Sequence, residues 1–256
     1  MPVATALRDT LWAVDLGAVK AAATPDLIRC AVGAAANARD LLADAELLSA
    51  GGRQARAYAL AAMAVEETGK AANMAALATM PVGVRAQAPV GRMLEWHQHK
   101  LVGGMLMGLV PFRPGATAGR LAEMPPDQVA EMMGNARALA QDQDELKQRA
   151  LYADIDREGC VRLPGEVTEA DVAAQLARAR QAVAAASTLL DPGAPAKLSD
   201  PPAEAVVLGR ALVSAFAEAG YDRTAQTAAD VALNTIRVVQ QQADATPDAG
   251  GRSSRD

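Results

Sequence analysis

The sequence has few of the residues on which several protein classes depend. Aromatic residues make up only 3% of its 256 residues, and there are two cysteines and two histidines. Cys30 and Cys160 lie far apart with no histidine near either, which argues against a disulfide framework and against a zinc site. No apolar run reaches the roughly 18 residues that cross a membrane, and the N-terminus lacks the basic and then apolar order of a signal peptide. We therefore expect a cytoplasmic protein without membrane contact.

Motifs for metal and cofactor binding are missing as well. The chain has no Glu-x-x-His pair of the kind that binds metals within helical bundles, and no His-Glu-x-x-His motif. It also has no glycine-rich phosphate loop and no Gly-x-Ser-x-Gly elbow. We expect no metal and no cofactor, so that any chemistry would depend on side chains alone.

Alanine is the residue that the chain has in abundance. There are 61 alanines, and 51% of all residues are apolar while 21% are charged. Alanine loses no side-chain entropy in a helix and lets neighbouring helices pack closely. The composition therefore predicts an all-α fold, in a chain long enough to bury a sizeable core.

Helix start and stop signals divide the chain into a helical bundle and a C-terminal part. Thr24 as the N-cap, followed by Pro25 and Asp26, is typical of a helix start, and Gly51-Gly52 of a helix end. We expect a bundle over residues 24–190, after an N-terminal segment over 1–23 with a weak helical pattern. Its five predicted helices cover approximately residues 24–50, 53–79, 92–109, 126–152 and 168–190. There follow a proline-rich linker over 191–202, a pair of helices within 203–242 and a disordered tail over 243–256.

Two connections within the bundle have no apolar period. Residues 81–91 are punctuated by proline and glycine and predict a connection to the third helix. Residues 154–164 are polar and rich in turn residues, and they predict either a short hairpin or a plain loop.

The second predicted helix, residues 53–79, carries an unusual polar row. Its first half is apolar on all sides, as expected for a helix at the centre of a bundle. Glu66, Lys70 and Asn73 nevertheless share a face with apolar residues, and Glu67 is adjacent. Burying an unpaired charge is costly, so the row needs a reason. Either Glu66 and Lys70 form a pair four residues apart where the helix meets solvent, or Glu66 or Glu67 orients a basic residue of a site.

The third predicted helix contains both histidines of the chain, between Arg92 and Lys100. It belongs to a basic stretch, residues 81–120, whose net charge of +4 contrasts with −9 for the rest of the chain. Seven residues at 100° each bring Arg92 and His99 to within about 20° of one face. His97 lies about 140° from Arg92, on the neighbouring face with Lys100. The spacing favours Arg92 with His99 as a site and leaves His97 as the alternative.

Several motifs resemble the helices of AbiV-type abortive-infection proteins. The most specific of them is Glu66-Glu67-Thr68-Gly69-Lys70. The resemblance covers roughly residues 26–190 and implies the HEPN superfamily, with a bundle of about five core helices and, here, two additional C-terminal helices. The other matching motifs are Asn37-Ala38, Leu41-Leu42, Asp44-Ala45, Gly52-Arg53, Ala57-Tyr58-Ala59-Leu60, Trp96 with His99-Lys100, and Leu151-Tyr152-Ala153-Asp154.

The resemblance implies a bacterial antiphage protein that arrests translation in infected cells. Many HEPN proteins are metal-independent endoribonucleases whose signature is an arginine, four to six residues and a histidine, assembled across a homodimer. Arg92 with His99, or with His97, fits this signature. RNA supplies its own nucleophile, the 2′-OH group, so a proton-transfer group with a pKa of about 7 and a cation near the phosphate suffice.

In this interpretation His99 moves the proton and Arg92 binds the phosphate through two hydrogen bonds. We expect the remaining polar residues to support these two. His97 and Lys100 add charge or a second proton-transfer group, Glu66 or Glu67 orients the basic cluster, and Arg85 and Lys70 bind RNA. The expected partners are RNA, a second copy of the chain, and a phage-encoded activator or an antitoxin.

A second interpretation comes from the residue after the arginine. Active nucleases of the superfamily usually have a polar residue there, and this chain has Met93. The alternative is a non-catalytic translation inhibitor that binds a ribosomal or phage protein through the same basic face.

Overall fold

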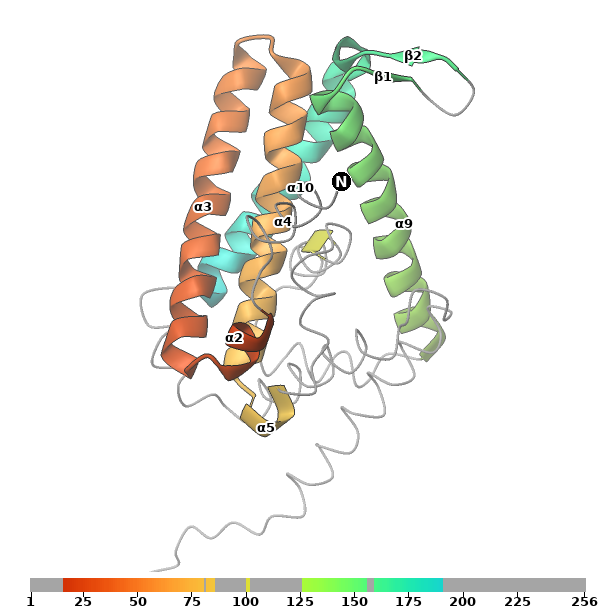
Figure 1. Ribbon diagram of the computed structural model, residues 1–256. Coiled ribbons are helices and arrows are strands. Elements are labelled where there is room, and N and C mark those ends of the chain that lie inside the picture. The colour runs from red at the N-terminus through yellow and green to blue at the C-terminus, as the bar shows by residue number, and fades with distance from the viewer. Residues whose placement is uncertain (1–15, 81, 86–99, 102–125, 156–158, 191–256) are drawn as a thin grey trace, which may run out of the picture.

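The computed structural model describes residues 16–80, 82–85, 100–101, 126–155 and 159–190, and these form an all-α bundle with one very small sheet (Figure 1). The long helices are α3 (Thr24–Ala50), α4 (Gln54–Ala78), α9 (Pro126–Leu151) and α10 (Glu169–Leu189). The short helices are α2 (Leu16–Ala21), α5 (Val82–Arg85) and the 3-10 turn η1 (Pro164–Glu166). The expected helices over 203–219 and 223–242, the linker and the tail lie outside the described residues.

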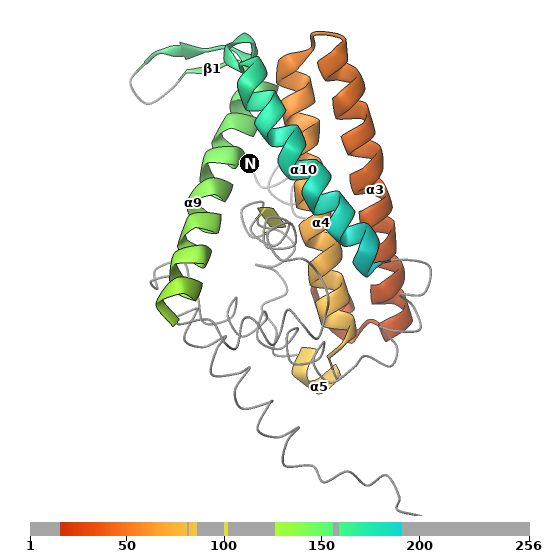
Figure 2. The same ribbon diagram turned by 180° about the vertical axis from the view of Figure 1, so that it is seen from behind.

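Helix α4 is the central element of the bundle. Helix α4 lies antiparallel beside α3. Helix α10 crosses α4 on one side, and α9 contacts α4 on another side (Figures 1 and 2). Sixteen of its 25 residues are buried, against seven of the 27 residues of α3. This confirms that the helix predicted as apolar on all sides lies at the centre.

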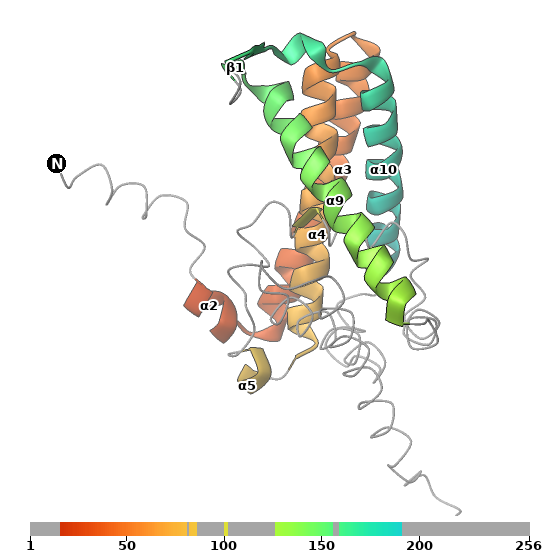
Figure 3. The ribbon, with the colours of Figure 1, turned by 90° about the vertical axis from the view of Figure 1, so that its right-hand side faces the viewer.

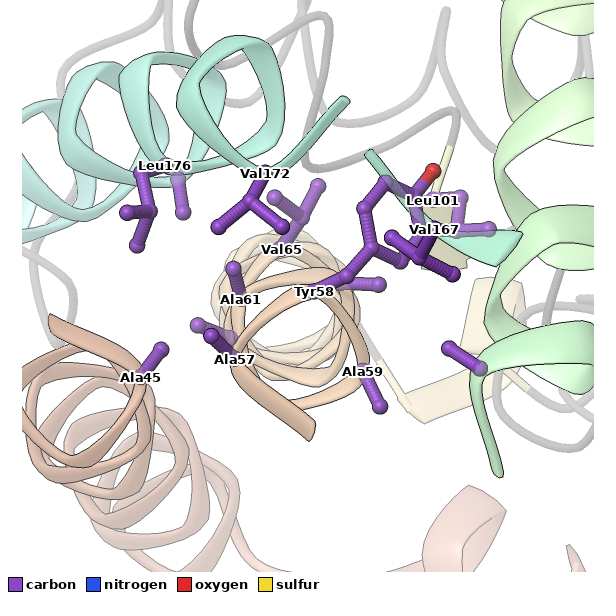
Figure 4. Close-up of a cluster of buried hydrophobic side chains, with 14 of the residues drawn as sticks. Ala45, Ala57, Tyr58, Ala59, Ala61, Val65, Leu101, Val167, Val172 and Leu176 are labelled. Carbon is purple, nitrogen blue, oxygen red and sulfur yellow. The ribbon is translucent and has the colours of Figure 1, made fainter. Parts of the chain in front are cut away.

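Alanine dominates the contact surfaces between these helices. One buried cluster joins α3, α4 and the end of α10 around Ala31, Ala71 and Leu77. The other surrounds the first half of α4 and includes Tyr58 and Val65 of α4 with Val172 and Leu176 of α10 (Figure 4). Small side chains let the backbones approach closely, and removing this apolar surface from water stabilises the fold.

The helix ends agree closely with the local sequence signals. Helix α3 ends at Ala50, and Gly52 then adopts the left-handed conformation with φ of 72°, which glycine adopts without steric cost. The start of α3 differs slightly from the prediction, because Thr24 is already helical and Ala23 occupies the N-cap position without a side-chain bond. Helix α10 begins with a complete capping box between Thr168 and Asp171.

The two connections differ from each other. The connection after α4 contains the one-turn helix α5. In the other, β1 (Asp154–Ile155) and β2 (Val161–Arg162) pair antiparallel, which selects the hairpin over the plain loop. Figure 3 shows this hairpin at the same end of the bundle as the turn between α3 and α4.

Among the described residues, no helix combines the length and the apolar character that a membrane span requires. Of the predicted helix over 92–109, only Lys100 and Leu101 are described, and both are helical.

Candidate functional site

A buried carboxylate on α4 gathers two lysines from distant parts of the chain. The Glu66 residue is only 5% exposed, and the ammonium of Lys147 on α9 donates a hydrogen bond to its Oε1. The Nζ atom of Lys100 lies 3.8 Å from Oε2 of the same carboxylate. Helix α4, helix α9 and the segment at residues 100–101 therefore meet at one ion cluster.

Lys147 is also held by a carboxylate on its own helix. Its Nζ atom lies 2.9 Å from Oδ1 of Asp144, one turn earlier. Glu66, Asp144, Lys100 and Lys147 together carry two negative and two positive charges. A cluster of this kind compensates the cost of taking charges out of water, which a single buried charge could not do.

The pKa of Lys147 shows that pairing outweighs burial. Burial alone lowers the pKa of an amine because the charged form loses its hydration. The charge of Glu66 acts in the opposite direction, as do hydrogen bonds to Glu66 and Asp144, and the pKa of Lys147 is raised above its ordinary value. Lys147 is therefore an ammonium at neutral pH, and its charge serves the cluster.

The polar row on α4 is divided between this cluster and other partners. Lys70 pairs with Glu67, with Nζ 3.5 Å from Oε1, and both side chains are partly exposed. Glu66 itself pairs with Lys147 and Lys100, so the ion pair printed for Lys70 joins it to the residue three positions earlier on the helix. Asn73 is buried, and Thr68 donates to the carbonyl of Ala64.

Both residues of the segment at residues 100–101 are fixed against the bundle, Lys100 by an ion pair and Leu101 by burial. The side chain of Lys100 is 13% exposed and reaches Glu66, whereas Leu101 is fully buried in the cluster around α4. Figure 4 shows Leu101 among the side chains of this cluster. The catalytic candidates Arg92, His97 and His99 lie outside the described residues.

Arg85 occupies a structural position in the described part of the fold. Its Nη1 atom donates to the carbonyl of Ala22 over 2.7 Å, and the residue is 2% exposed. Burial lowers the pKa of this guanidinium. Arg85 ties α5 to the connection between α2 and α3, and binding RNA would require the side chain to leave this position.

Lys147 and Asp144 belong to the ion cluster but were not predicted from the sequence. A signal for them was present, because Ala140, Gln143, Lys147 and Ala150 follow the i, i+3, i+7, i+10 spacing of one helix face and are all buried. Two polar residues on an otherwise alanine-lined face indicate partners elsewhere in the bundle. Accordingly, Nε2 of Gln175 on α10 lies 3.5 Å from Oε1 of Gln143 and donates to it.

In the part of the chain that the structure describes, no three histidine, cysteine or carboxylate side chains gather as a metal site would need. The ion cluster fixes the position of Lys100 against the central helix α4.

Comparison with known protein families gives a match over most of the described helices. The model of the HEPN_AbiV family, described as AbiV, matches residues 26–184, which is more than half of the chain. This range contains α4 and α9 and most of α3 and α10. No curated protein matches the chain. No solved structure matches it either.

Proposed function

The chain belongs to the AbiV family of HEPN proteins, which indicates a function in abortive infection, and we propose that it acts there as a metal-independent endoribonuclease that arrests translation. Family membership supports the antiphage role. The nuclease activity rests on the Arg92 to His99 signature and on the ion cluster that holds the adjoining residue.

One observation carries this proposal, and it is the contact between Glu66 and Lys100. Lys100 follows His99 directly, and consecutive Cα atoms are about 3.8 Å apart. Anchoring Lys100 on a buried carboxylate, and Leu101 in the core, therefore restricts the chain immediately beside the candidate histidine. A catalytic group needs such a fixed position, because small displacements lower the rate strongly.

The ion cluster changes the role that we assign to Lys100. Its ammonium is largely buried and faces Glu66, so we assign it to positioning and not to contact with the phosphate. Glu66 acts in the same way through Lys100. Glu67 and Lys70 pair with each other at the partly exposed edge of the same helix, where Lys70 remains our candidate for RNA contact.

The proposed reaction is an internal transesterification of RNA. His99 removes the proton of a 2′-OH group, whose oxygen forms a bond to the adjacent phosphorus while the bond to the 5′-oxygen breaks. Arg92 binds the phosphate oxygens as negative charge develops, and His97 is the candidate that protonates the leaving 5′-oxygen. The products are a 2′,3′-cyclic phosphate and a 5′-OH end. We propose that two copies of the chain each contribute one such set at a two-fold axis.

The test is RNA cleavage by the purified full chain in the presence of EDTA, with analysis of the 3′ ends. We expect cleavage that survives EDTA and leaves cyclic phosphate ends. His99→Ala and Arg92→Ala should each lower the rate by about 100-fold or more, the range typical of a lost proton-transfer group or a lost phosphate ligand. His97→Ala serves as the matched variant that separates the two histidines.

Glu66→Gln tests the positioning role within the same assay. We expect kcat to fall while KM for RNA stays nearly constant, because the carboxylate does not touch RNA. Glu46→Gln, at an exposed pair with Arg180, is the control and should leave both constants unchanged.

Met93 favours a second candidate function, a non-catalytic translation inhibitor. In that case the wild type would leave RNA intact but inhibit protein synthesis in a cell extract, and Arg92→Ala would remove the inhibition by weakening partner binding. Intact RNA together with inhibited synthesis would therefore reject the nuclease and support the inhibitor.

A further inference from the structure

Large apolar side chains are exposed mainly at one end of the bundle. Eight such side chains are exposed in the described residues, and six of them lie at the end formed by the α3–α4 turn, the last turn of α9 and the hairpin (Figures 1 and 3). Single exposed apolar residues are ordinary on protein surfaces, but a concentration of them marks an interaction site. The six are Leu47, Leu151, Tyr152, Ile155, Val161 and Leu163, and the other two are Met63 and Val82.

A pocket of about 840 Å³ opens at this same end. It lies between the first turns of α4, the last turn of α9 and the segment around η1. Most of its wall is apolar, with Leu48, Leu60 and Val167 among the residues that line it. Leu151 belongs both to the pocket wall and to the exposed apolar set, so the pocket and the apolar surface are continuous.

Two arginines are the charged residues among those that line the pocket. Arg53 precedes α4 and Arg56 lies in its first turn, three residues later, and both are exposed. No described carboxylate forms an ion pair with either of them. Glu166 lies between two lining residues, Gly165 and Val167, but is not itself part of the wall. The pocket thus offers positive charge beside an apolar surface.

We propose that this end of the bundle, the hairpin end, is a docking surface for a protein partner that presents an acidic side chain between large apolar ones. The carboxylate would lie between Arg53 and Arg56, and the apolar side chains would cover Leu151, Tyr152 and Leu163. Charge complementarity selects such a segment, because two unpaired guanidinium groups favour a carboxylate through charge-assisted hydrogen bonds. The apolar surroundings exclude water and strengthen that interaction.

The same features argue for a protein and against RNA as the occupant. RNA surfaces are recognised by many cations along the backbone and by aromatic side chains that stack on bases. Here the exposed set is aliphatic except for Tyr152, and the lining residues include only two cations. Aliphatic surface beside arginine is typical of protein interfaces.

The docking surface is separate from the candidate catalytic site. Arg56 and Glu66 are ten residues apart on α4, which corresponds to about 15 Å along the helix axis. The proposal therefore does not depend on nuclease activity, and its failure would leave the proposed function untouched.

The test uses a library of random 12-residue peptides displayed for selection on the immobilised full chain. We expect enriched peptides to carry Asp or Glu flanked by Leu, Ile, Val or aromatic residues. Their binding, measured by fluorescence anisotropy with synthetic copies, should weaken at least about tenfold in Arg53→Glu/Arg56→Glu, since each lost charge-assisted bond contributes substantially to affinity. Tyr152→Ser/Leu163→Ser should weaken the same peptides by removing apolar contact area.

These variants are expected to fold. Negative side chains in the first turn of α4 interact favourably with the helix dipole, and the apolar pair is more than half exposed. Arg29→Glu/Arg39→Glu on α3 changes the net charge equally at another exposed surface and should leave binding unchanged.

Each other outcome would overturn the proposal. Selection without enrichment, or enriched peptides that bind equally to the Arg53/Arg56 variant, would exclude an acidic peptide site here. Single-stranded RNA that binds the wild type and is lost in the same variant would assign the surface to RNA. A dimer in sedimentation that dissociates in Tyr152→Ser/Leu163→Ser would assign it to a second copy of the chain.

Discussion

Glu66 on α4 accepts a hydrogen bond from Lys147 on α9, a residue 81 positions later in the chain, and both side chains are almost fully buried. The pair joins the central helix to a helix that packs against it less extensively than α3 does. Because Lys100 approaches the same carboxylate, one buried charge links the segment at residues 100–101 to α4 and α9.

Removing either partner of this pair should destabilise the fold strongly. We expect Glu66→Leu and Lys147→Met each to lower the free energy of unfolding by about 3–5 kcal/mol, because each leaves a buried charge without its main partner. The double variant should lose less than the larger single loss, since apolar side chains of similar volume replace both charges. Urea denaturation of the four proteins measures this, and additive losses would contradict the coupling.

The control for this cycle is an exposed pair. Nε of Arg180 lies 2.7 Å from Oε1 of Glu46, with both side chains about half exposed. Glu46→Gln should lower the free energy of unfolding by less than about 1 kcal/mol, because solvent screens exposed ion pairs.

Stability should fall at high pH because of Tyr58. Burial raises the pKa of the Tyr58 hydroxyl to about 12 from its ordinary 10.0. Between these values the unfolded chain loses the proton while the folded chain keeps it, so the contribution is fully present below pH 10 and is lost as the pH rises toward 12. Between pH 10 and 12 we expect the free energy of unfolding to fall by about 1 kcal/mol per pH unit.

Tyr58→Phe isolates this contribution, because the ring remains and the titrating group is lost. Unfolding by urea at several pH values from 9 to about 11.5 should show a weaker pH dependence in the variant than in the wild type. Lys147 also loses its charge at high pH, but it does so in both proteins. Equal slopes would show that Tyr58 ionises without penalty in the folded state.

The capping box of α10 should contribute measurably to stability. The Thr168 hydroxyl accepts from the backbone of Asp171, whose carboxylate in turn accepts from Thr168. Thr168→Ala should lower the free energy of unfolding by about 1 kcal/mol at pH 7, whereas Thr168→Ser keeps the hydroxyl and should be nearly neutral.

The same box has a pH dependence of the opposite sign to that of Tyr58. Hydrogen bonds from Thr168 lower the pKa of Asp171 below its ordinary 3.8, so the carboxylate stabilises the fold above that pH and the contribution is lost as the pH falls below it. The difference between wild type and Thr168→Ala should therefore shrink at about pH 2–3. A constant difference would mean that Asp171 has no part in the cap.

Gly51 and Gly52 form a matched pair after α3. Gly52 has φ of 72°, whereas Gly51 has φ of −84°, which any residue adopts. Gly52→Ala should lower the free energy of unfolding by about 1 kcal/mol, because alanine is strained in the left-handed region. Gly51→Ala should leave the free energy of unfolding nearly unchanged. Thermal unfolding measures the stability of both variants. Equal losses of stability would show that the backbone conformation of Gly52 is not the cause.

Much of the fold could be predicted from the sequence because the signals are local. Gly51-Gly52 ends α3 at Ala50, and Thr168 caps α10 as expected. The central position of α4 followed from its apolar first half. The N-cap assignment of Thr24 was wrong by one residue, since Pro25 is tolerated throughout the first turn and does not fix the exact start.

The candidate site was predictable only in part. The cost of burying a charge predicts that Glu66 needs a partner, but it does not identify that partner. Lys70 is four residues away on the same helix, yet Glu66 contacts Lys147 and Lys100. A helical pattern indicates which face of a helix is buried and carries no information about which distant residue meets it.

The sequence by itself determined the helical character, the ends of the long helices and the membership of the AbiV family, because propensity, capping and motifs depend on residues close together in the chain. The tertiary structure decided what long-range packing alone can decide. It selected Lys147 as the partner of Glu66, buried Arg85 against the carbonyl of Ala22, and gathered exposed apolar residues of α3, α9 and the hairpin at one end of the bundle. Each of these depends on how helices approach one another in space, and the free energy that fixes this approach is distributed over the whole core.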